Sequence, residues 1–113
     1  MQATAKLRNL RMAPRKVRLL ADMVRGKPVG AALSELQFSQ KRAAKPVAKL
    51  IQSAVANATQ ADPNVDVDRL VISKIAVDGG PIAWKIMPRA MGRAYWISKR
   101  SSHVTVVVDD QAR

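Results

Sequence analysis

The sequence contains no cysteine, few aromatic residues and few acids. Without cysteine, disulfides and thiolate metal sites are excluded, and nothing indicates an oxidising compartment. No apolar run approaches the ~20 residues that a membrane-spanning helix needs. The N-terminus also lacks a basic stretch followed by an apolar segment, so we expect no secretory signal. These absences predict a soluble, cytoplasmic protein with no membrane partner.

Positive charge is what the chain has in excess. Its 113 residues include 20 Lys or Arg but only eight Asp or Glu, so the formal net charge is +12. A small domain with this imbalance repels itself and favours a polyanion, because each phosphate that it neutralises releases a condensed counterion. Hydrophobic residues make up 48% of the chain, which is too many for a disordered basic tail. We therefore predict one folded domain, spanning residues 1–113, with a basic surface.

Apolar periodicity predicts the secondary structure. Alternating apolar residues and cations near the N-terminus indicate a half-buried strand, and apolar stripes at helical spacing indicate three helices. Pro14 and Pro28 suit the first turns of two of these helices. Pro46 would be unfavourable in the interior of the third helix, so the start of that helix is left open. Strands are expected at about 3–10, 70–78 and 103–108, the last two as partners, and helices at about 14–25, 28–36 and 41–60.

Residues 81–100 are the most unusual segment of the chain. They contain five cations and no acid, together with both tryptophans and the only tyrosine. This segment is too long for an ordinary compact loop, and its aromatic residues favour extended structure. Pro88 and Gly92 bracket the expected tip. We therefore predict a long β-hairpin at about 80–100, which would reach about 30 Å at ~3.3 Å per residue and project its rings into a partner.

The cations are candidates for phosphate contact. Eight of them face a single acid within the first 27 residues, so pairing along a helix cannot explain them, and the alternative is a solvated surface. In the hairpin, cations interleave with rings that stack on unpaired bases, which favours structured RNA over duplex DNA. The alternative there is a Trp84–Trp96 pair that only stiffens the hairpin. The predicted RNA-binding residues are Lys6, Arg8, Arg11, Arg15, Lys16, Arg18, Arg25, Lys27, Arg42, Lys45, Lys85, Arg89, Arg93, Lys99, Arg100 and His103.

Catalysis has no convincing candidate residues. His103, the only histidine, has no cysteine or clear acidic orienter nearby, so we expect it to be structural or to donate a hydrogen bond to nucleic acid. Ser101 and Ser102 form no recognisable nucleophile motif. The sequence has no metal-ligand cluster, no phosphate-binding loop and no dinucleotide-binding glycine motif, so we expect no metal and no cofactor.

Three other functions compete with a noncatalytic RNA scaffold. A DNA-reading regulator requires a recognition helix and usually dimer symmetry, and neither is evident. An RNA-modifying enzyme requires a cofactor loop or an acid–base pair, which the sequence lacks. A binder of anionic membranes requires a basic helix with a large exposed apolar face, and the apolar stripe at 14–25 is better used in a core. We therefore favour the scaffold and expect no homo-oligomer.

Five motifs occur in order along nearly the whole chain, from about residue 3 to residue 109. They are R-K-V-R-L-L-A-D-M-V-R-G-K at 15–27, S-A-V-A-N-A at 53–58, V-D-G-G-P at 77–81, I-M-P-R-A-M-G-R-A at 86–94 and K-R-S-S-H-V-T-V-V-V at 99–108. Together they closely resemble the bacterial L-twenty-two family of large-subunit ribosomal proteins.

The resemblance implies an α+β fold of three helices packed on a small antiparallel sheet, with a long protruding β-hairpin. It implies a protein of the cytoplasmic ribosome that binds large-subunit (23S) ribosomal RNA, assists its assembly and contacts neighbouring large-subunit proteins. It also implies that the hairpin lines the nascent-peptide exit tunnel and meets the nascent peptide. The tunnel-proximal positions would be Ala83, Trp84, Lys85, Gly92, Arg93 and Ala94.

The chain departs from the family's pattern in the hairpin. Members of the family commonly have basic residues where this chain has Ala83, Trp84 and Met91. A more polar pair stands where this chain has Tyr95 and Trp96. The resemblance therefore implies an RNA role for this hairpin with an unusual share of rings.

Overall fold

A three-stranded antiparallel sheet forms one layer of the body in the computed structural model, which describes residues 2–88, 90–92 and 94–110. The strand order is β1–β5–β2, with β5 (Ser102–Asp109) between β1 (Gln2–Leu10) and β2 (Val71–Gly79). The three strands predicted for the body are confirmed, and each end lies within one residue of its expected position. The antiparallel register that joins β2 to β5 confirms that these two strands are partners.

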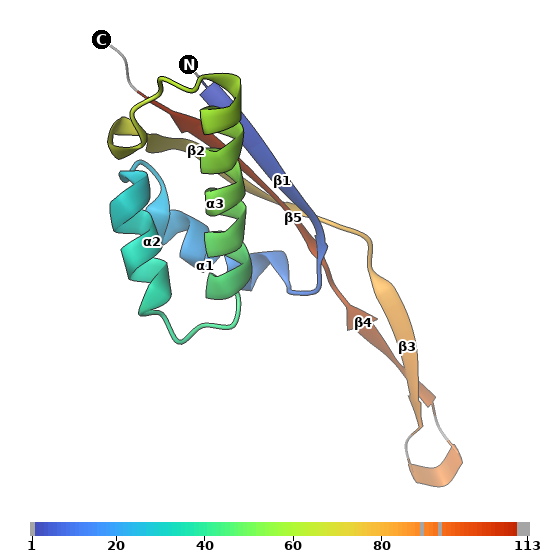
Figure 1. The fold of residues 1–113 in the computed structure, drawn as a ribbon. Helices are drawn as coiled ribbons and strands as arrows, with labels where there is room; N and C mark the ends of the chain where they lie inside the picture. The colour runs from blue at the N-terminus through green and yellow to red at the C-terminus, as the bar shows by residue number, and fades with distance from the viewer. Residues whose placement is uncertain (1, 89, 93, 111–113) are drawn as a thin grey trace.

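Three helices cover one face of the sheet and form the second layer (Figure 1). They are α1 (Pro14–Val24), α2 (Val29–Gln37) and α3 (Ala44–Ala61). After α1, Gly26 has a φ of +78°, a left-handed conformation that favours glycine, and its N–H donates to the carbonyl oxygen of Ile72 in β2 (3.0 Å). The end of α1 is thereby fixed to the sheet, and the predicted α+β class is confirmed.

The third helix begins later than we expected. We expected the helix over about 41–60 but left its start open, because Pro46 could be accommodated in a first turn; α3 begins at Ala44 and so places Pro46 in its first turn. The first four N–H groups of a helix have no acceptor within the helix, so a proline there removes no hydrogen bond. The proline is therefore compatible with a regular helix that continues to Ala61.

The core lies between the two layers and is made mainly of small apolar side chains. Alternate residues of β5 face the helices, and Val104, Val106 and Val108 are fully buried. On the helix side, α3 contributes fully buried Ile51 and Ala54 among others. None of the described residues between 80 and 100 belongs to this core. The segment predicted to protrude therefore takes no part in the main hydrophobic cluster.

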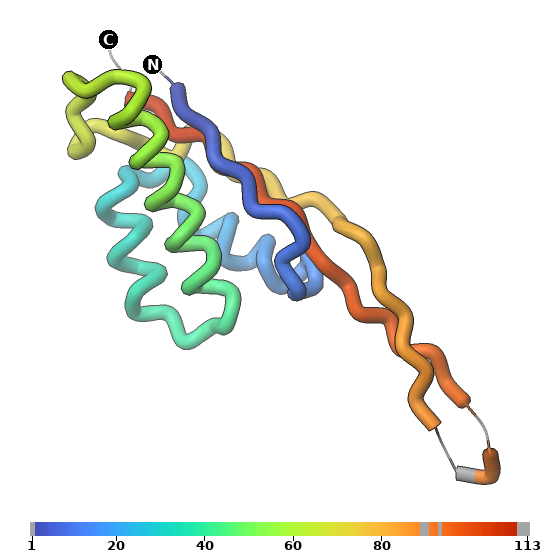
Figure 2. Tube along the Cα trace, turned by 45° about the vertical axis from the view of Figure 1, so that its right-hand side comes forward, coloured from blue at the N-terminus to red at the C-terminus, as the bar shows by residue number. Residues whose placement is uncertain are grey.

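A two-stranded hairpin extends the molecule beyond this body. β3 (Ala83–Pro88) pairs with β4 (Ala94–Lys99), and a short turn of 3-10 helix, η2 (Ala90–Gly92), lies at the tip. The predicted hairpin is confirmed, although each paired arm has 6 residues and not the nine or so that we expected. Figures 1 and 2 show the hairpin continuing in the direction of β2 and β5, past the helices. The molecule measures 66 × 26 × 17 Å, and its radius of gyration of 17.3 Å exceeds the ~13 Å of a compact chain of this length.

Hydrogen bonds fix the hairpin root, which we define as residues 80–82 and 100–101. The N–H of Gly80 donates to the carbonyl oxygen of Ser101 (2.9 Å). The hydroxyl of Ser101 in turn donates to the carbonyl oxygen of Pro81 (2.6 Å). Next to the root, the fully buried hydroxyl of Ser102 donates to the carbonyl oxygen of Met12 (2.7 Å). The two arms and the segment before α1 are therefore tied together where the hairpin leaves the body.

Candidate nucleic-acid interface

A groove of about 1190 Å³ lies between the hairpin root and the body. Its walls come from the junction of β1 and α1, from the segment before α3, and from the root and the adjoining ends of β3 and β4. Among the described residues that line it, none is acidic. We call it the cationic groove, because seven of its lining residues are Arg11, Lys16, Lys41, Arg42, Lys85, Lys99 and Arg100.

Local structure holds several of these cations at the groove. The bond from Ser102 to Met12 fixes the segment that carries Arg11. α1 begins at the groove, with Ala13 in the lining and no side chain capping its first turn. The positive end of the helix dipole therefore adds to the field of the cations. Cations that converge from several segments, with no acid between them, form a surface suited to a polyanion.

The fold brings together six of the sixteen predicted RNA-binding residues in this groove. They come from three parts of the chain, which the sequence alone could not place side by side. Lys41 is the one groove cation that the prediction missed, although it stands four residues before Lys45 and so falls on the same face of the expected helix. The signal that could have found it is its position directly beside Arg42 in a segment without acids. Lys45 itself is exposed on α3 and does not line the groove.

Lys6 and Arg8 lie on a second surface, the open face of the sheet. Ala3 and Ala5 of β1 are buried, whereas Lys6 and Arg8 alternate with them and are exposed. The side chain of His103 also lies on this face, because its neighbours on either side in β5 are buried. Of the predicted residues, six therefore line the cationic groove, and Lys6, Arg8 and His103 lie on the open face of the sheet.

His103 makes a structural contact at the end of β1. Its Nδ1 accepts a hydrogen bond from the backbone N–H of Asn9 (3.1 Å). Asn9 has a φ of +59° and lies where the pairing of β1 with β5 becomes irregular. Because Nδ1 accepts, the proton of the neutral ring is assigned to Nε2. The contact supports the structural interpretation of His103 and still leaves Nε2 as a donor.

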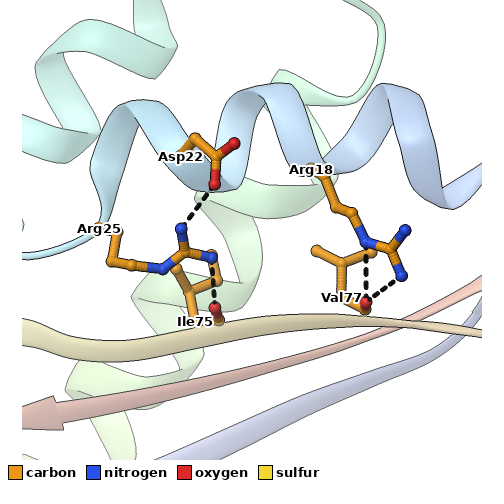
Figure 3. Close-up of polar contacts among 5 residues, drawn as sticks. All are labelled: Arg18, Asp22, Arg25, Ile75 and Val77. Atoms are coloured by element: carbon orange, nitrogen blue, oxygen red, sulfur yellow. Dashed lines mark hydrogen bonds and ion pairs between the residues drawn. The ribbon is translucent and has the colours of Figure 1, made fainter.

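Arg18 and Arg25 reach from α1 to backbone carbonyls of β2 (Figure 3). Nε and Nη2 of Arg18 both donate to the carbonyl oxygen of Val77, at 3.2 and 3.0 Å. Nη2 of Arg25 donates to the carbonyl oxygen of Ile75 (2.9 Å), and its Nη1 pairs with Asp22. These two arginines therefore join α1 to the sheet, a role that charge pattern alone did not indicate. A phosphate contact by either remains a prediction.

The other predicted cations are distributed around the molecule. Nζ of Lys27 pairs with Oε1 of Glu35 at 2.6 Å, which ties the start of α2 to a later turn of the same helix. Arg15 is exposed on α1 outside the lining of the groove. Arg89 and Arg93 fall outside the described residues. The tip of the hairpin is therefore described only in part.

The tunnel-proximal candidates fall on the hairpin. Ala83, Trp84 and Lys85 are exposed on β3, Gly92 is exposed at the tip, and Ala94 is exposed on β4, while Arg93 is outside the described residues.

The register of the hairpin shows how the two tryptophans are placed relative to each other. Trp84 lies opposite Ser98, and Trp96 lies opposite Ile86. The two tryptophans are diagonal neighbours on one face, not directly opposite each other. A contact between the two tryptophans across the strands would therefore be diagonal, and their role in stiffening the hairpin stays a prediction.

No group of three or more His, Asp or Glu residues that could hold a metal ion occurs in the part of the chain that the structure describes. Among the same residues, no helix is both long and apolar enough to cross a membrane.

Comparison with known proteins gives a consistent result. The family described as "Ribosomal protein L22p/L17e" matches residues 5–109. A protein of Myxococcus xanthus named "Large ribosomal subunit protein uL22" is 56% identical over 109 residues, which cover 96% of each chain. A protein of the same name from Geobacter sulfurreducens is 54% identical over 111 residues, which cover 98% of this chain and 99% of the relative. Another, from an Anaeromyxobacter species, is 58% identical over 102 residues, which cover 90% of this chain and 71% of the relative.

Proposed function

Because the chain belongs to the ribosomal protein L22p/L17e family, and is therefore a structural ribosomal constituent and not an enzyme, we propose that it binds the RNA of the large subunit through the cationic groove. The relatives are named as proteins of the large ribosomal subunit, which supports the proposal of large-subunit (23S) ribosomal RNA as the polyanion. The observation that carries the proposal is the convergence of seven cations on one groove whose described lining residues include no acid.

The groove suits a folded RNA because its cations come from different directions. Arg11 and Lys16 lie on the body, whereas Lys99 and Arg100 lie on the hairpin side. A single strand of phosphates in the groove would be contacted from both sides, and each neutralised phosphate would release counterions. Binding would therefore fix the hairpin relative to the RNA and would favour assembly of the RNA around it. The open face of the sheet, with Lys6 and Arg8, provides a second contact.

The hairpin gives the protein its reach within the particle. It accounts for much of the 66 Å length, and its described residues lie outside the hydrophobic core. In keeping with the resemblance, the hairpin would pass through the RNA to line the exit tunnel, where Gly92 and Ala94 at its tip would lie near the nascent peptide. Neighbouring large-subunit proteins would be its other partners. The protein would act as a single copy in cytoplasmic ribosomes, without a cofactor.

Removal of two groove cations tests the proposal. We expect Lys16→Gln with Lys41→Gln to bind large-subunit RNA about tenfold more weakly at constant salt, because two phosphate contacts are lost. The matched control is Lys49→Gln with Arg69→Gln, which removes the same charge from exposed positions outside the groove. Equilibrium binding to purified RNA measures both. Equal losses in the two double variants would show that net charge alone governs binding and would contradict a specific groove.

A further inference from the structure

The two faces of the hairpin carry different chemistry. Side chains alternate between faces along a strand, and the register places Trp84, Ile86 and Trp96 on one of them. Lys85 and Lys99 lie on the other. We call the first the ring face; its remaining members are Pro88, Ala94 and Ser98, so none of its six paired residues is charged. The second, which we call the lysine face, consists of Ala83, Lys85, Met87, Tyr95, Ile97 and Lys99.

The large apolar side chains of the ring face are exposed in the free protein. The exposed fraction is 58% for Trp84, 58% for Ile86 and 66% for Trp96. A cluster of this kind on a protruding element is unusual for a soluble surface and marks a place where a partner binds. The hydrophobic core does not include them, so their burial has to come from outside the chain.

We propose that the ring face is a stacking platform for unpaired nucleobases of the bound RNA, with Trp84 and Trp96 as the stacking residues. This inference rests on the proposed function and adds to it the part of the RNA that is recognised. Indole rings stack on any base, because every base presents a flat π surface. The lysine face would contact phosphates at the same time, so the hairpin would separate stacking from charge neutralisation.

Continuity with the cationic groove identifies the occupant. Three residues of the lysine face, Ala83, Lys85 and Lys99, line the groove. Ser98 lines it too and lies directly opposite Trp84 on the ring face, so the ring face borders the groove at this pair. A strand whose phosphates lie in the groove would bring its next bases onto the rings. The diagonal separation of the two tryptophan backbones, about 7–8 Å, lets bases of one strand reach both. An apolar protein surface would explain the rings but not their position beside a groove lined by cations.

The chain offers a direct probe, because its only two tryptophans are both on this face. Intrinsic tryptophan fluorescence therefore reports on the ring face alone. We expect a short single-stranded RNA to quench this fluorescence on binding, since stacking on a base changes the environment of the indole. Duplex RNA with the same number of phosphates, and inorganic polyphosphate, should bind with little quenching. Equal quenching by the duplex, or binding of the single strand without quenching, would overturn the inference.

Substitutions separate stacking from charge. Trp84→Ala or Trp96→Ala should each weaken binding of the single strand about tenfold, while the slope of log affinity against log salt stays unchanged. The control on the opposite face is Lys85→Ala, which should reduce that slope by about 0.7. A changed slope for the tryptophan variants, or an unchanged affinity, would refute stacking. If the wild-type chain bound none of the three probes, the proposed function would fail as well, whereas binding without quenching would refute the stacking platform alone.

Discussion

Gly80 stands where the chain passes from β2 into the hairpin, and its lack of a side chain allows a close approach there. A Cβ atom at this position would lie 2.6 Å from Oγ of Ser101 and 3.2 Å from Cε1 of His103. Both neighbouring side chains are held by hydrogen bonds, since Ser101 donates to Pro81 and His103 accepts from Asn9. Any side chain larger than a hydrogen atom would therefore disturb the hairpin root and the end of β1 together.

We expect Gly80→Ala to lower the free energy of unfolding by about 2 kcal/mol. The reasons are the loss of the hydrogen bond from Ser101 to Pro81 and the crowding of the imidazole ring of His103. Urea denaturation measures the change. The control is Gly79→Ala, where a Cβ atom would have no neighbour within 4 Å and the effect should be small. Equal stability of the two variants would mean that the root tolerates the extra atom and that its packing is looser than described.

At single residues, the sequence could not predict which acceptor a charged side chain meets. Arg18 and Arg25 were predicted to contact RNA, and the structure shows that each also donates to a carbonyl oxygen of β2. A guanidinium group binds either acceptor, and only the position of β2 beneath α1 decides which is near. The burial of Val17 and Leu20, by contrast, followed directly from helical periodicity and is confirmed.

The hairpin is the element that composition predicted best. Rings and cations without an acid, around Pro88 and Gly92, indicated a protruding arm, and the structure contains one. Its register could not be predicted in the same way. A shift of the turn by one residue along the chain would place Trp84 directly opposite Trp96, and the sequence of the tip does not settle that position. The ring face therefore emerged only from the pairing of β3 with β4.

The independence of the hairpin from the body leads to a prediction for this element. Replacing residues 85–97 with Asn-Gly, which favours a tight two-residue turn, would leave Trp84 opposite Ser98. We expect the free energy of unfolding to change by less than about 1 kcal/mol, because no described residue of the removed segment belongs to the core. Urea denaturation followed by far-ultraviolet circular dichroism measures it. A loss of several kcal/mol would contradict the division into body and arm.

Across the whole molecule, several of the acids lie together at one end of the long axis. The end opposite the hairpin carries Asp62 at the end of α3, Asp66 before η1 (Val67–Arg69) and Asp109 at the end of β5 (Figure 1). The cationic groove lies at the root of the hairpin. Phosphate attracts one end and repels the other, so the hairpin end would enter the RNA and the acidic end would remain outside.

This arrangement combines what the sequence could and could not predict. The sequence shows an excess of cations and an acidic stretch that contains Asp62 and Asp66. Together with the rings of residues 81–100, the excess of cations was enough to predict an RNA partner. The groove could not be predicted from the sequence, because it requires the junction of β1 and α1, the segment before α3 and the hairpin root to meet in space. Contacts between segments so far apart are set by the packing of the helices on the sheet, which no local pattern encodes.

Directed hydroxyl-radical probing tests the central claim most directly. The chain has no cysteine, so a single introduced cysteine can carry an iron chelate at a chosen position in reconstituted large subunits. The test position is Ser98→Cys in the cationic groove, and the control is Gln60→Cys near the end of α3, about 25 Å along the helix from its start. We predict strong cleavage of large-subunit RNA from Ser98→Cys and weak cleavage from Gln60→Cys. Equal cleavage from both, or stronger cleavage from Gln60→Cys, would contradict an RNA-binding groove at the hairpin root.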